Sequence, residues 1–226
     1  MDTDSPATPT TGDPAGNDPA APTTDPAEEE LHEEEVAYSD DAALPPDEGE
    51  VDLFWQEASK SAGLTRLDVV IGTNPEALVP PPAWQFGWTA KQATELVELV
   101  LSGAKTATAG PLSDYDDGVE QLPTIGELGI ACDGAGHPRA LVRTDAVAVV
   151  PFDEVDELHA AAEGEGDLSL DFWRRAHVRM LPGHEGRDID EPWPEDTPWP
   201  TDDMVLERIS CVHPRPRRSF REVLDA

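Results

Sequence analysis

The chain has 226 residues, of which 48 are Asp or Glu and only 15 are Lys or Arg, so its formal net charge is -33. That length allows one ordinary domain with tails, or two small domains. Non-specific binding to long nucleic acid depends on Lys and Arg side chains that neutralise phosphates, so this charge argues against such a partner. No run approaches the roughly 18 apolar residues that a membrane span needs, so no membrane partner is expected.

The charge is unevenly distributed along the chain. Residues 1–50 hold 16 of the acidic side chains, and the first basic residue is Lys60. Pro, Thr, Asp, Ala and Glu dominate this stretch, which has too little apolar surface to offset the entropy of ordering a chain. We therefore expect residues 1–48 to be a disordered acidic leader; it has neither the basic nor the apolar region of a secretory signal. Residues 51–213 form the predicted domain, and 214–226 a basic tail that could touch RNA or fold against the acidic body.

Residues 51–63 predict a short helix, with Phe54, Trp55 and Ala58 towards one side and a glycine as its stop. Residues 64–88 contain several prolines and three aromatic side chains, which indicates an ordered loop that wraps the domain.

A helix over residues 89–102 has the clearest signals. Thr89 and Gln92 have the spacing of a capping box, in which both side chains satisfy free backbone groups at a helix start. Apolar residues then recur at three- and four-residue steps, and Gly103 is placed to end the helix in a left-handed conformation.

The remaining elements alternate between strands and helices. Residues 105–110 suit a short strand, 127–144 predict two strands around a Gly-containing turn, and 146–152 a third strand buried on both faces. Residues 153–167 begin as a helix and break at glycines, 169–181 predict an amphipathic helix, 182–203 a loop, and 204–212 a last strand. This order predicts an α+β domain built around a mainly antiparallel, curved sheet.

The two cysteines, Cys132 and Cys211, lie in strand-like stretches, which indicates reduced core thiols in a cytoplasmic protein rather than a disulfide. His177 and His184 are seven residues apart with a Pro-Gly step between them, a poor arrangement for a metal. We expect neither a metal site nor a cofactor.

Residues 84–110, WQFGWTAKQATELVELVLSGAKTATAG, resemble the ASCH family, whose hallmark is a helix, a Gly-x-Lys turn and a strand that line a cleft. The resemblance continues in three further blocks and covers nearly all of residues 51–213. It implies a small, curved, antiparallel β-barrel similar to the PUA fold, with flanking helices and a cleft beside the helix that ends at Gly103.

One branch of this family consists of amidohydrolases that remove the acetyl group from N4-acetylcytidine. That branch has a Lys after the turn, a Thr three residues later, and a Glu after a His-Ala step. Lys105, Thr108 and Glu163 occupy these positions here. The resemblance implies that Thr108 is the nucleophile, that Lys105 activates it if burial keeps the amine partly neutral, and that Glu163 shuttles a proton to the departing nitrogen. Residues three apart on a strand face opposite sides, so this arrangement requires a bulge or twist.

The chain departs from the common motif Gly-x-Lys-x-x-Glu-x-Arg. Thr108 stands at the Glu position and Gly110 at the Arg position, which removes a contact to substrate. The alternatives therefore stay open: a non-catalytic RNA- or nucleotide-binding ASCH module, or a ribonuclease. Lys105 and Glu163 could also be solvated charges, and Thr108 a strand former.

Four other residues are candidates for binding a small nucleoside or an RNA-like ligand in the cleft. Trp84 and Trp88 could stack on a base or pack in the core. Tyr115 lies in a loop that could fold over the cleft. Arg143 could contact a phosphate or pair with an acidic side chain.

Overall fold

The computed structural model describes residues 41–62, 79–115 and 121–214, all within one compact unit. Most of the predicted leader and tail therefore lies outside the described residues. The structure does describe residues 41–48, which were predicted as the end of the leader. Leu44 N–H donates to the Gly134 carbonyl over 2.9 Å, and the Asp47 side chain caps the first helix. No helix in these described ranges is long and apolar enough to cross a bilayer.

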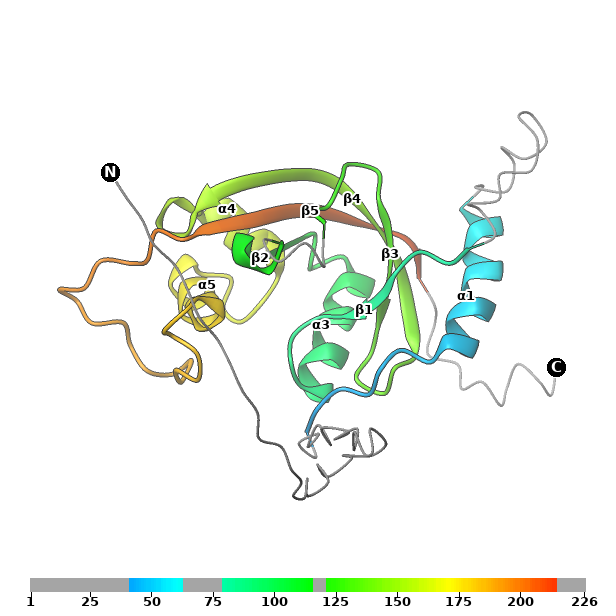
Figure 1. The fold of residues 1–226 in the computed structure, drawn as a ribbon, viewed down its shortest axis with the longest axis horizontal. Coiled ribbons are helices and arrows are strands. Elements are labelled where there is room, and N and C mark those ends of the chain that lie inside the picture. The colour runs from blue at the N-terminus through cyan, green and yellow to red at the C-terminus, as the bar shows by residue number, and fades with distance from the viewer. Residues whose placement is uncertain (1–40, 63–78, 116–120, 215–226) are drawn as a thin grey trace, which may run out of the picture. The chain divides into compact units, whose positions relative to one another are not determined.

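Five strands form one curved sheet in the order β1-β3-β4-β5-β2 (Figure 1). The antiparallel strands β4 and β5 run side by side over most of their length, whereas β1 pairs with β3 in parallel. β1 and β2 form the two edges, so the sheet is curved but not closed into a barrel. The predicted α+β class with an ASCH-like curved sheet is confirmed. The strands are β1 (Ala83–Gln85), β2 (Ala107–Pro111), β3 (Leu128–Cys132), β4 (Pro138–Pro151) and β5 (Asp203–Pro214).

Four α-helices occur in the described ranges: α1 (Glu48–Ser61), α3 (Ala90–Ser102), α4 (Glu157–Glu163) and α5 (Leu170–His177). The helix predicted over 89–102 is confirmed as α3. The Thr89 side chain accepts a hydrogen bond from the Gln92 amide, and Gly103 ends the helix with φ 79°. α3 packs under the curved sheet, where Val97 and Val100 are buried (Figure 1).

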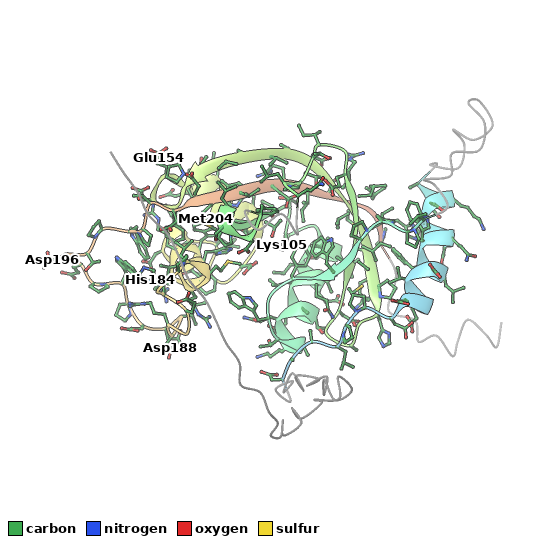
Figure 2. All side chains as sticks on the ribbon, viewed as in Figure 1. Lys105, Glu154, His184, Asp188, Asp196 and Met204 are labelled. Carbon is green, nitrogen blue, oxygen red and sulfur yellow. The ribbon has the colours of Figure 1, made fainter. Side chains whose placement is uncertain are left out.

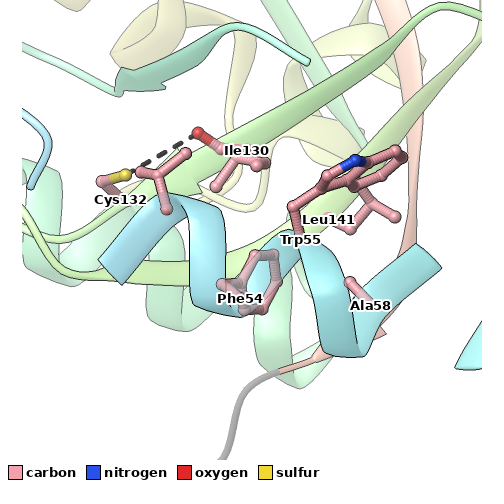
Figure 3. Packing of buried hydrophobic residues seen from close by; sticks show 7 residues of the cluster. Phe54, Trp55, Ala58, Ile130, Cys132 and Leu141 are labelled. Carbon is pink, nitrogen blue, oxygen red and sulfur yellow. Dashed lines mark hydrogen bonds between the residues drawn. The ribbon is translucent and has the colours of Figure 1, made fainter. Parts of the chain in front are cut away.

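α1 lies at one end of the sheet, and the apolar residues predicted on one side of this helix are among those that it buries (Figure 1). Phe54, Trp55 and Ala58 pack against Ile130 and Leu141 of the sheet (Figure 3). Complete burial of these side chains contributes roughly 1.5–3 kcal/mol for each large apolar group.

The two cysteines have different environments. Cys132 is buried in the same cluster, and burial, with the carboxylates of Asp133 and Glu50, raises the pKa of its thiol to about 12. Cys211 is exposed, so the expectation of two core thiols is wrong for this residue. Both thiols are free, and the described residues contain no group of His, Cys, Asp and Glu side chains arranged to hold a metal ion.

Two strand predictions need correction. The second and third predicted strands are one continuous strand, β4, and its second half is not buried on both faces, since Val149 is 45% exposed. β1 lies within the stretch predicted as a loop. Its three residues are too few to produce a periodic pattern, and its pairing with β3 is a long-range contact that sequence periodicity does not report.

Candidate functional site

Lys105 lies between the end of α3 and the start of β2. The left-handed turn at Gly103 reverses the chain, and the Ala104 and Lys105 amides both donate to the Leu99 carbonyl. Only 1% of the Lys105 side chain is exposed. The register of β2 with β5 is unbroken, so the bulge expected in β2 is absent. Lys105 instead precedes the strand, where the alternation of faces does not apply, and it lines the same cavity as Thr108.

Glu163 meets this lysine from the end of α4. The Thr106 amide donates to the Ala162 carbonyl over 2.7 Å, which fixes the end of α4 beside the start of β2. Lys105 Nζ donates to Glu163 Oε2 over 2.8 Å and to Glu165 Oε1 over 2.6 Å. A buried ammonium is therefore held between two carboxylates.

The second oxygen of Glu163 is surrounded by nitrogens from α4 and α5. Trp173 Nε1 donates to Glu163 Oε1 over 2.7 Å, and the Nε2 atoms of His159 and His177 lie 3.1 and 3.5 Å from it. The Trp173 indole and the His177 ring are stacked with centroids 4.3 Å apart. Both oxygens of this fully buried carboxylate therefore have partners.

The ionised forms of both central groups are favoured. Burial alone would lower the pKa of Lys105, but the charges of Glu163 and Glu165 and their hydrogen bonds outweigh it and raise that pKa. Burial alone would raise the pKa of Glu163, but His177, Lys105 and the hydrogen bond from His159 outweigh it and hold the pKa well below its usual range. Lys105 is therefore an ammonium and Glu163 a carboxylate near neutral pH.

The cleft beside this cluster has two lobes, and Thr108 lines both. The first lobe, of about 460 Å³, contains Lys105, Glu163 and Glu165; the second, of about 650 Å³, extends towards β3 and β5. Figure 2 shows Lys105, which lines the first lobe, beneath the arc of β4 and β5. The lobes share the lining residues Gln85, Phe86, Gly87, Thr108 and Ala109.

The binding candidates are divided between the two lobes. Trp88 lines the first lobe, is 53% exposed, and has the Arg179 guanidinium 5.7 Å from its ring. Trp84 and Tyr115 line the second lobe, where Trp84 also packs edge-on against Phe86. Arg143 lines neither lobe; its half-exposed side chain pairs with Asp145 over 2.8 Å, the second of the two contacts expected for it.

Several residues around Lys105 and Thr108 were not predicted as part of the site. His159 lies one helical turn before Glu163, and Trp173 and His177 are likewise one turn apart. This spacing can be read from the sequence. Glu165 follows the helix end and gives no periodic signal. Glu207, in the second lobe, is brought there by strand register alone.

Comparisons with known proteins agree with this architecture. The sequence model of the ASCH domain matches residues 82–208. A crystal structure of a protein from Enterococcus faecalis V583, described as family DUF984, is 30% identical, with a TM-score of 0.53; the match covers 72% of this chain and 88% of that one. An ASCH domain structure from Lactobacillus crispatus JV V101 is 25% identical, with a TM-score of 0.49, and the match covers 68% and 94% of the two chains. No curated protein matches the chain.

Proposed function

This chain belongs to the ASCH domain family, and from that premise we propose that it is a small-substrate amidohydrolase acting on a modified nucleoside such as N4-acetylcytidine. One observation carries the proposal. A buried, charged cluster around Lys105 lies in the same cavity as Thr108, and Lys105, Thr108 and Glu163 are the three residues that the resemblance implies for such an enzyme.

In this proposal Thr108 attacks the acyl carbon and Lys105 stabilises the oxygen of that acyl group. The raised pKa of Lys105 does not fit the neutral amine that activation of Thr108 requires, so we assign the lysine a different role. Its ammonium has three N–H groups, and two of them point at Glu163 and Glu165. No acceptor for the third is found among the described residues, and we assign it to a substrate oxygen that becomes negative in the transition state, an effect of about 3–4 kcal/mol for one such donor in other enzymes.

Glu163 then has a positioning role. A carboxylate that already accepts from Lys105, Trp173 and His159, and whose pKa is strongly lowered, is a poor proton shuttle. It holds the ammonium in place beside Thr108 and keeps it charged. This replaces the shuttle role that the resemblance implied.

The size and charge of the cleft support a small substrate without phosphates. Each lobe falls in the range of roughly 300–1,000 Å³ that is usual for small-molecule sites. Trp88 offers an exposed ring on which a base can stack, with Arg179 beside it. The net charge of -33 disfavours long RNA but imposes no penalty on a neutral nucleoside.

A second candidate is an ASCH module that binds a nucleoside-like ligand without chemistry. Gly110 favours it, because the family motif has an Arg at that position and its loss removes a substrate contact. Trp88 and Arg179 serve this function equally well, since stacking needs no nucleophile.

Hydrolysis of N4-acetylcytidine, followed by chromatographic separation of cytidine, tests the proposal. Turnover should disappear in Lys105→Ala and persist in Lys91→Ala, a matched control because Lys91 is exposed and outside both lobes. If the purified protein binds the nucleoside in calorimetry but does not hydrolyse it, the binding module replaces the enzyme. If it does neither, this substrate class is wrong.

A further inference from the structure

The second lobe contains an acidic side chain directly opposite Thr108. Thr108 of β2 is the register partner of Glu207 of β5 in an antiparallel pair. Side chains of directly paired residues project from the same face of a sheet, with Cβ atoms about 4.5–5.5 Å apart. Both residues line the second lobe, so the carboxylate and the hydroxyl face the same space.

Glu207 is less constrained than Glu163. Its Oε2 accepts one hydrogen bond, from Thr144 Oγ1 over 2.9 Å, and its side chain is only partly buried. No Lys, Arg or His is among the described residues that line the second lobe, so no cation there holds the carboxylate in its ionised form. Glu207 can therefore gain and lose a proton during a reaction, whereas Lys105 and Glu163 are fixed in their charged forms by each other.

We propose that Glu207 is the proton-transfer residue of the cleft, acting first as general base towards Thr108 and then as general acid towards the leaving nitrogen of the amide. This inference rests on the proposed amide hydrolysis and supplies the base that the Lys105 cluster lacks. It also places the reacting amide where the two lobes meet at Thr108, with the acyl oxygen towards Lys105 and the leaving nitrogen towards Glu207, while the base can reach Trp88 in the first lobe.

The chemistry balances with water as the only co-reactant. The Glu207 carboxylate accepts the Thr108 hydroxyl proton while Thr108 Oγ bonds to the amide carbon. When the C–N bond breaks, the Glu207 carboxyl delivers that proton to the nitrogen, which leaves as the free amine. A water molecule then gives a proton to the carboxylate and adds to the acyl carbon. The ester C–O bond breaks, Thr108 Oγ recovers the proton, and the acid is released.

The environment of Glu207 is suited to this exchange. Burial raises the pKa of its carboxyl; the hydrogen bond from Thr144 opposes that effect, and the nearby charge of Glu127 adds to it. Glu127 and Tyr115 are the other titratable groups among the described residues of the lobe. A general acid–base is most effective when its pKa approaches the working pH, so a shift upward from the usual carboxyl range favours catalysis.

Two assays on the full-length protein test the inference: hydrolysis of N4-acetylcytidine, and transfer of an acetyl group from p-nitrophenyl acetate to Thr108, detected by intact mass. In Glu207→Gln we expect both rates to fall about 10²–10⁴-fold with little change in KM, and the acidic limb of the pH profile to vanish. Glu207→Asp should recover part of the rate. Glu154→Gln, on an exposed residue outside both lobes, should match the wild type.

The outcomes separate the two proposals. If the wild type acetylates Thr108 but leaves the nucleoside intact, and the acetylation needs Glu207, the substrate is wrong and the inference stands. If the wild type hydrolyses the nucleoside and Glu207→Gln does so equally well, the inference is overturned and the amidohydrolase stands. If no acetyl group reaches Thr108 and no nucleoside is hydrolysed, both are overturned. Thermal unfolding of each variant establishes that a lost rate is not a lost fold.

Discussion

Lys105→Met should destabilise the protein far more than removal of an exposed lysine. The substitution keeps the apolar stem but leaves Glu163 and Glu165 buried or half-buried without their shared cation. Removing one partner of a buried ion pair costs about 3–5 kcal/mol, since the remaining charge stays desolvated. With a urea dependence of about 2 kcal/mol per M, the midpoint should fall by about 2 M.

Lys91→Met is the matched control for this measurement. Lys91 pairs with Glu95 over 3.9 Å on the helix surface, where both side chains are more than half exposed, and such a pair contributes about 0.5 kcal/mol or less. Urea unfolding followed by Trp fluorescence gives both values. The double variant Lys105→Met/Glu163→Gln should recover part of the loss, which a double-mutant cycle reports as coupling. The loss of unfolding free energy in Lys105→Met could instead lie within about 0.5 kcal/mol of the loss in Lys91→Met, as for an exposed pair. That result would refute the buried cluster.

Three further perturbations give distinct expected results. The pKa of Glu163 is lowered in the folded state, so its contribution to stability is present above the unfolded pKa of about 4.5 and is lost as the pH falls below that value. The unfolding free energy of the wild type should therefore decrease more steeply in acid than that of Glu163→Gln. Gly110→Arg should fold normally, since a Cβ there meets no atom within 4 Å. The variant should bind a nucleoside 5′-monophosphate more tightly in calorimetry, because the new cation lies in a lobe that is lined by carboxylates and has no other cation among its described residues. Trp88→Ala should weaken nucleoside binding with little change in melting temperature, because the Trp88 ring is exposed. Trp84→Ala should lower the melting temperature, because the Trp84 ring packs against Phe86. Equal melting temperatures of the two variants would contradict this difference.

Local signals and the family resemblance predicted different parts of the molecule. α3 was predictable from the Thr89 cap, the apolar repeat and Gly103, all of which act within a few residues of each other. Lys105 and Thr108 followed from the resemblance, because the Gly-x-Lys turn is a short motif.

The rest depended on long-range geometry. Glu207 faces Thr108 only because β2 and β5 pair in one register, and a shift of one residue would turn it to the other face. Trp173 reaches Glu163 only after α4 and α5 pack together. The charged state of Lys105 could not be predicted from the sequence either. Part of the rise in its pKa comes from the carboxylate of Glu165, which no sequence pattern placed near Lys105.

The tight contact at Gly164 has a consequence for how activity can be lost. Gly164 follows Glu163 with φ 74°, and a Cβ there would lie 2.6 Å from the Ala104 carbonyl oxygen. Any side chain would push α4 away from the turn that carries Lys105, separating the ammonium from its carboxylate. A genetic screen for inactive alleles should therefore recover substitutions of this glycine alongside those of the charged residues, although it has no functional group to lose.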